Sequence, residues 1–545
     1  MASDPENSKE SAADNPAVIT VEDKDERRVV GKAEEMLIEV AAEGTDFEHQ
    51  LSVREALKIY WRGVCFTVII TLTIIMRVYD IVIINSFFAL PAFRNKFGFA
   101  VEGSGNQIPA PWQVALGNAS LVGQVIGAFL IAYPMEWIGR KWTLIFSLIG
   151  TSALTFMQFF APSIQVLTAS EYLSGVIWGF YQVLIPTYSS EMLPTVLRPY
   201  LAGGINLAYC IGSLILNGIT ESFDTYTTEW GYRIPFALQW LWPAIVLPCL
   251  IFTPESPWWL VRRDRLDEAE KALRRLSSNS PKVDVHRTMA MMQKTILYEK
   301  KIESGSTVWQ CFKGASRRRT EIVVMIFFCQ DFAGFATNNA YFFEQLNLST
   351  QTAFDIAIGN AAIGLAAAAS SAILIRYFHR RPIFVIGMGL IVIYEFLVGI
   401  LSCAPHYHNR PSLSWGQVGI TMLSTATFQA TIGPLAYILL TEVPSARLRA
   451  KTVGVAIAVD ALCGIVTSTV QPYLINPSEA NLGGKSSFVW GGLSVISFVW
   501  CFFRLPETKH RTVEEVDYLF EHKVKTKEFK GYSIDAEALK NDLVE

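Results

Sequence analysis

The chain has 545 residues, of which 51% are hydrophobic and only 17% are charged. This balance is unusual for a soluble protein, and the apolar residues gather in blocks of about 20, the length that a helix needs to span a bilayer. The net charge of -3 leaves no basic surface for a nucleic-acid partner, so we expect none.

The N-terminal segment is polar and mostly acidic. Such a composition buries too little apolar surface to fold, and we expect residues 1–58 to be a disordered cytosolic tail. Six apolar spans then follow within residues 59–252 and predict a six-helix bundle: 64–90, 112–133, 142–161, 164–188, 202–219 and 234–252.

A charged stretch, residues 253–320, separates these spans from the rest. It predicts a cytosolic linker with short helices, of which residues 266–276 are amphipathic, with acidic residues early and basic residues late. A second six-helix bundle is expected within residues 321–504, followed by a cytosolic tail at 505–545: its spans are 321–343, 352–375, 382–404, 415–440, 453–472 and 488–503. The pattern predicts an all-α membrane protein with about twelve transmembrane helices in two halves, the layout of a secondary carrier embedded in a lipid bilayer.

Arginines and lysines concentrate in alternate loops, which the positive-inside rule places in the cytosol together with both termini. Glutamates accompany these arginines at matching places in the two halves. We expect ion pairs between the halves that close the cytosolic face and break when the halves rock. The candidates are Glu136, Arg140, Glu191, Arg198, Glu255, Arg380, Glu442, Arg447 and Glu507.

Ionisable residues inside the apolar spans are functional candidates, because an unpaired charge in a bilayer is costly. Asp80 lies in the middle of the first span, with Arg77 one turn before it. Arg77 is expected to pair either with Asp80 or with Glu171 in the fourth span. Asp460 in the eleventh span is a further candidate for proton coupling.

Uncharged polar residues within the spans could line the path of a sugar, whose hydroxyls need hydrogen-bond donors and acceptors. The alternative is hydrogen bonding between helices. The chain shows no nucleophile, metal or phosphate-binding constellation, so we expect no catalytic site, no metal site, no cofactor and no enzyme activity. The candidate substrate-binding residues are Asn206, Ser213, Gln239, Gln330, Asn338, Asn339, Asn360 and Gln429.

The loop motifs together resemble the sugar-porter family of the major facilitator superfamily. Several stretches are similar to its fungal maltose/α-glucoside permease branch: YRIPFALQW, PESPWWLVRRDR, AYFFEQ, TIGPLAY and PSARLRAKT. The resemblance covers residues 56–520. It implies the major facilitator fold and proton-coupled import of an α-glucoside, such as maltose or a related oligosaccharide, by alternating access. It also implies a plasma-membrane protein, which we expect to be a monomer.

The chain departs from the branch at charged positions. Arg77 stands where the branch has an acid, Gln124 where it often has a glutamate, and Ile457-Ala458 where it has an Arg-Asn pair; Ser213 replaces a common glutamine. These changes leave four hypotheses open. The protein could be a facilitator, a symporter that uses Asp80, Glu171 or Asp460, a transporter or exporter of a non-sugar or anionic metabolite attracted by Arg77, or a sugar sensor that does not transport.

Overall fold

The computed structural model describes most of the chain after residue 50. The residues described are 40, 51–101, 105–223, 225–278, 280, 283–303, 308–333, 340–346, 348–405, 410–445, 448–476, 479–509, 511, 513–530 and 532.

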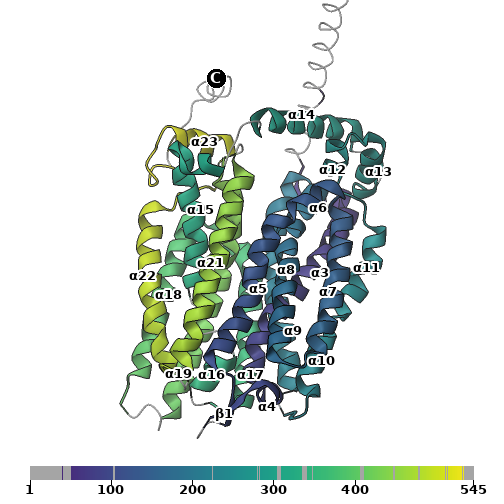
Figure 1. The fold of residues 1–545 in the computed structure, drawn as a ribbon. Helices are drawn as coiled ribbons and strands as arrows, with labels where there is room; N and C mark the ends of the chain where they lie inside the picture. The colour runs from purple at the N-terminus through teal and green to yellow at the C-terminus, as the bar shows by residue number, and fades with distance from the viewer. Residues whose placement is uncertain are drawn as a thin grey trace, which may run out of the picture.

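The helices before the linker form one group (Figure 1). A break at residues 239–240 divides the last helix of this group in two, and Pro235 and Pro243 lie on either side of it. Proline favours such a break because it cannot donate a backbone hydrogen bond to the preceding turn. The long helices are α3 (Trp61–Phe87), α5 (Ala110–Leu130) with its continuation α6 (Ala132–Trp137), α7 (Arg140–Phe159), α8 (Ile164–Met192), α9 (Arg198–Ser222), and α10 (Trp230–Leu238) with α11 (Leu241–Phe252).

The helices after the linker form a second group beside the first (Figure 1). A break at Thr431 divides its fourth long helix. The group consists of α15 (Gly314–Phe332), the short α16 (Ala340–Gln345), α17 (Thr350–Tyr377), α18 (Arg380–Ser402), α19 (Pro411–Ala430) with α20 (Ile432–Glu442), α21 (Arg449–Ile475) and α22 (Ser487–Arg504).

Within the described ranges, nine helical segments are long and apolar enough to cross a membrane. Three further helices, α8, α9 and α15, run alongside them (Figure 1). Of these three, α8 contains the acid Glu171 and α15 begins with a run of arginines that includes Arg319. The predicted all-α membrane protein is confirmed.

The two ends of the molecule differ. At one end, which we call the linker end, lie α12 (Pro257–Arg262), α13 (Leu266–Leu276) and α14 (Val285–Glu303), and α13 has the predicted bounds. At the other, the hairpin end, α4 (Pro91–Phe97) is followed by the antiparallel strands β1 (Phe99–Val101) and β2 (Gly105–Gln107), which were not predicted (Figure 1).

The prediction that residues 1–58 are disordered is wrong for the last of them, which form α2 (Val53–Ile59). A capping box begins this helix: the Ser52 hydroxyl accepts from the Glu55 backbone N–H at 3.3 Å, and the Glu55 carboxylate accepts from the Ser52 N–H at 3.4 Å. Ala56 and Ile59 are buried against the bundle. The earlier part of the predicted tail lies outside the described residues, apart from residues 40, 51 and 52.

The C-terminal segment also folds onto the bundle. Helix α23 (Val513–Glu521) buries Leu519 and Phe520 in the apolar core of the second half, and Arg319 forms an ion pair with Asp517. The predicted cytosolic tail at 505–545 therefore includes a docked helix at the linker end (Figure 1).

The two halves meet at several places, among them the packing of α9 against α17 and of α5 against α21. The Asn118 amide on α5 donates to the Thr469 hydroxyl on α21 at 2.7 Å. Within the first half, α5 and α8 approach so closely that a Cβ on Gly127 would lie 2.0 Å from the carbonyl oxygen of Val176.

Candidate functional site

Asp80 is fully buried near the middle of α3. Its carboxylate accepts hydrogen bonds from Trp178 Nε1 at 2.6 Å, Gln239 Nε2 at 2.7 Å and Gln158 Nε2 at 3.2 Å. Gln239 reaches it from the break between α10 and α11. This places Gln239 beside Asp80, and Gln239 is not among the residues that line the hollow between the halves described below.

Glu171 on α8 belongs to the same buried site. It accepts from Gln158 Nε2 at 2.9 Å, and the same nitrogen donates to Asp80 at 3.2 Å, so one amide joins the two carboxyl groups. Both acids are buried, and their side-chain donors among the described residues are neutral. Two acids this close in an apolar site favour the state in which one of them carries a proton.

Arg77 pairs with neither acid, so both predicted pairings are wrong. Its guanidinium donates to the Tyr209 hydroxyl on α9, to Gln124 Oε1 at 2.7 Å and to Gln182 Oε1 at 3.3 Å. Asp80 and Arg77 therefore have separate sets of hydrogen-bond partners, and the described partners in both sets are neutral. Two of the departures from the branch, Arg77 and Gln124, thus meet in space.

Asp460 lies on α21 of the opposite half. It is within electrostatic reach of Arg77, with Tyr209 as a common neighbour. Arg77 is thus held by neutral groups of its own half and lies near an acid of the other half.

A hollow of 210 Å³ lies between α3 and α9 of the first half and α17 and α19 of the second. Three predicted residues line it: Ser213, Asn360 and Gln429. The Asn206 amide donates to Gln429 Oε1 at 3.1 Å and joins α9 to α19 at its edge. The structure therefore brings these four predicted residues together.

Sequence reasoning missed Tyr209, Asn217 and Thr425, which also line the hollow. Tyr209 and Asn217 lie four residues before and after Ser213 on α9, so helical spacing was a signal that could have found them. The predicted Gln330 is on α15 and does not line the hollow, while Asn338 and Asn339 lie outside the described residues.

At the linker end of the first half, Glu255 caps the start of α7. Its carboxylate accepts from the backbone N–H groups of Arg140 at 2.9 Å and Lys141 at 3.1 Å, a favourable place for an anion. Burial raises the pKa of Glu255, and these N–H donors oppose the rise. The Arg140 guanidinium pairs with Glu191 at 2.9 Å, and the Ser256 hydroxyl donates to the same carboxylate.

The second half repeats this arrangement. Glu507 accepts from the backbone N–H groups of Arg380 and Arg381, both at 3.1 Å, at the start of α18. The Arg380 guanidinium pairs with Glu442, which also accepts from the Thr508 hydroxyl at 2.7 Å.

The prediction that these charges form ion pairs between the halves is wrong for Arg140–Glu191 and Arg380–Glu442, each of which lies within one half. In each half, one glutamate accepts from the backbone at the start of a helix and a second pairs with the arginine at that start. All of these groups belong to the same half.

The other predicted loop residues are placed as follows. Glu136 contributes its backbone carbonyl, which accepts from Trp259 Nε1 at 2.9 Å and from Arg263 at 2.6 Å. Arg198 is half-buried at the start of α9, and Arg447 lies outside the described residues.

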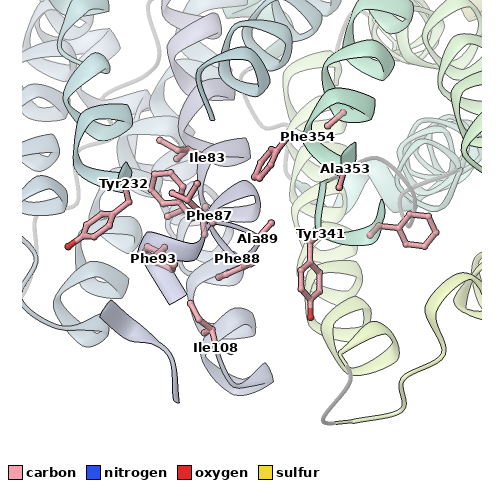
Figure 2. Packing of buried hydrophobic residues seen from close by; sticks show 14 of the residues in the cluster. Ile83, Phe87, Phe88, Ala89, Phe93, Ile108, Tyr232, Tyr341, Ala353 and Phe354 are labelled. Atoms are coloured by element: carbon pink, nitrogen blue, oxygen red, sulfur yellow. The ribbon is translucent and has the colours of Figure 1, made fainter. Parts of the chain in front are cut away.

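At the hairpin end the halves share an apolar cluster (Figure 2). Phe87 and Phe93 of the first half, with ring centroids 5.3 Å apart, belong to the same buried cluster as Tyr341 and Phe354 of the second. Beside it, Arg94 on α4 forms an ion pair with Glu344 on α16, at 2.7 Å. Sequence reasoning missed this pair between the halves.

Comparisons with known proteins agree with this architecture. The family profile described as "Sugar (and other) transporter" matches residues 64–520. The chain is 30% identical over 530 residues to the general α-glucoside permease of Saccharomyces cerevisiae, covering 96% of this chain and 85% of that protein. It is 32% identical over 504 residues to a maltose permease of the same yeast, covering 91% and 81%.

Solved structures show the same fold. The chain is similar to the xylose transporter XylE from E. coli in a partially occluded inward-open conformation, with a TM-score of 0.67 and 20% identity, covering 83% of this chain and 99% of that one. A second XylE structure, described as a proton:xylose symporter of the major facilitator superfamily bound to 6-bromo-6-deoxy-D-glucose, gives a TM-score of 0.66 at 21% identity, covering 85% and 99%. The solved structures show the fold, and the profile over residues 64–520 shows that the chain belongs to the sugar transporter family and is a carrier rather than an enzyme.

Proposed function

We propose that this sugar transporter imports an α-glucoside, such as maltose or a related oligosaccharide, by alternating access and together with a proton. The similarity to α-glucoside and maltose permeases over most of the chain supports the substrate class. The linker end would face the cytosol, in keeping with its basic loops, and the protein would work as a monomer in the plasma membrane.

The hollow between the halves carries the proposal for the substrate site. Its wall presents a hydroxyl or an amide from each half, with Ser213 and Asn217 on one side and Asn360 and Gln429 on the other. Such groups suit the donors and acceptors of a sugar ring. With 210 Å³ the hollow is below the usual ligand pocket of about 300 Å³, so an oligosaccharide requires the halves to separate there.

The Asp80–Glu171 pair carries the proposal for proton coupling. Both acids are buried, both accept from the Gln158 amide, and their described donors are neutral, so the pair is suited to take up one proton. Gln239 links it to the break between α10 and α11, a place where the backbone can adjust as the halves move. Loss of the branch acid at position 77 would then leave coupling to this pair.

An anionic substrate is the second candidate, because the acceptors that the structure describes for the Arg77 guanidinium are all neutral. Arg77 lies behind Tyr209, and the lining of the hollow that the structure describes includes Tyr209 but not Arg77. This arrangement favours a neutral sugar.

Uptake assays test the proposal directly. Radiolabelled maltose, glucose and a panel of glucosides would be offered to a transport-null yeast strain that expresses the protein, at two external pH values. We expect α-glucoside accumulation that collapses with a protonophore. Equilibration that is independent of pH would indicate a facilitator, and no uptake of any sugar would contradict import and favour a sensor or an exporter.

A further inference from the structure

A hollow of 320 Å³ lies on α3 and α9 near the linker end, apart from the sugar site. Val64, Val68 and Ile75 of α3 border it on one side and Leu207 and Ile211 of α9 on the other, while Leu57 of α2 lies at its mouth. Its walls are almost entirely apolar.

This hollow faces away from the transport path. Tyr209 and Ser213 of α9 point to the hollow between the halves, whereas Gly204, Leu207 and Ile211 follow a different face of the same helix. Val68 is 57% exposed there, as expected for a side chain in contact with lipid. Because the groove lies on the outside of the bundle, it faces the hydrocarbon of the bilayer.

One polar atom in the wall lacks a partner. Thr67 is 4% exposed and lines the hollow, yet its hydroxyl makes no hydrogen bond to any residue that the structure describes. Its neighbour Thr71 also lines the hollow but donates to the Thr67 carbonyl at 2.8 Å, as threonines in helices commonly do. A buried hydroxyl without a partner calls for an acceptor from a ligand.

Cations lie near the linker end of the hollow, on α2, α3 and α13. Arg54 and Lys58 are exposed on α2, Arg62 is exposed at the start of α3, and Arg275 of α13 lies over the Phe66 ring. Among described residues none of the four takes part in an ion pair. A second hollow, of 330 Å³, flanks the same turns of α3 and brings Arg62 and Arg275 together. We call these four residues the basic collar.

We infer that this groove binds one anionic phospholipid of the leaflet at the linker end. Its phosphate and headgroup lie at the basic collar, an ester carbonyl accepts from the Thr67 hydroxyl, and an acyl chain fills the groove between α3 and α9. Basic clusters beside the end of a membrane helix attract anionic headgroups. The apolar groove gives the acyl chain a defined place to bind. This inference does not depend on which sugar is carried.

The test measures lipid retention on the purified full-length protein. The carrier is equilibrated in nanodiscs of phosphatidylcholine with or without phosphatidylserine, released, and examined by native mass spectrometry for bound lipid. We expect one retained phosphatidylserine, in preference to phosphatidylcholine. Replacing Arg54, Lys58 and Arg62 by glutamine should lower that preference about fivefold for each cation removed.

Gly204→Leu tests the contribution of the apolar groove independently of the basic collar. A Cβ on Gly204 meets nothing within 4 Å, so a leucine there fills the hollow without disturbing the helix, and retention should be lost. Gly218→Leu is the matched control, because it lies on the same helix in equally open space but outside the hollow. Thr67→Val should weaken retention about fivefold, whereas Thr71→Val should not.

Each result decides the matter. Loss of the lipid in Gly204→Leu with retention in Gly218→Leu supports the site. Unchanged retention in Gly204→Leu, equal retention of phosphatidylcholine, or displacement of phosphatidylserine by a sterol would overturn it. The melting temperature of each variant shows that the protein is folded.

Discussion

Asp80 is the residue on which the proposed proton coupling depends. Asp80→Asn keeps the size of the side chain but removes one of the two acids that the Gln158 amide joins. We expect this variant to lose accumulation of sugar against a gradient while still equilibrating it, as measured by uptake with and without a protonophore. Glu395→Gln on α18 is a control, because Glu395 is equally buried but distant in the fold. Full accumulation by Asp80→Asn would move the coupling role to another acid.

Glu255 gives a prediction for the pH dependence of stability. Burial raises its pKa above the ordinary value of 4.5, so the folded protein keeps the proton at a pH where the unfolded chain has released it. Stability therefore increases as the pH falls from the raised pKa towards the ordinary value. Against Glu255→Gln, which cannot titrate, the wild-type melting temperature should rise across that window. A difference between the two proteins that does not vary with pH would contradict this cause.

The sequence identified the buried charges but not their partners. Spacing along one helix suggested Asp80 or Glu171 for Arg77, whereas its actual partners Gln124 and Tyr209 belong to α5 and α9. Neutral amides and hydroxyls on other helices cannot be assigned from spacing, because each of them can also serve helix packing. Polar residues four apart on α9, by contrast, did carry a usable signal.

The contact between α5 and α8 depends on glycine. Gly127→Ala would place a Cβ 2.0 Å from the Val176 carbonyl oxygen, so the helices must move apart at a cost of about 2 kcal/mol. Thermal unfolding in detergent should show a lower melting temperature. Gly117→Ala on the same helix meets nothing within 4 Å and should leave it unchanged or raise it. Equal melting temperatures for both variants would show that the contact is loose.

Hydropathy located the long helices well, because a run of about 20 apolar residues is typical of a membrane-spanning helix. It could not locate the breaks at residues 239–240 and 431, since both lie inside apolar stretches. It also missed α2 and α23, which are short and polar on one side and gain stability from docking on the bundle rather than from their own composition.

For the molecule as a whole, the ion pair between Arg94 and Glu344 helps to hold the hairpin end closed. Glu344→Gln should favour separation of the halves at that end about fivefold, because it removes a partly buried pair that joins them. Spin labels on the two halves at the hairpin end, with distances measured by pulsed electron resonance, would detect the change.

Two variants control this prediction. Glu229→Gln breaks the Lys96 pair at the same end but within one half, and should not move the halves. Exchanging the charges, with Arg94→Glu and Glu344→Arg together, should restore the wild-type distances. Failure of the exchange to restore them would mean that the effect of Glu344→Gln does not arise from the pair.

The glycine contact between α5 and α8 also has a practical use. Two helices whose backbones touch cannot change their separation without breaking their packing, so the distance between them should stay constant while the halves move. A pair of probes on α5 and α8 would then serve as an internal ruler. Any spread in that distance would report the behaviour of the labels themselves, and distances across the halves could be corrected for it.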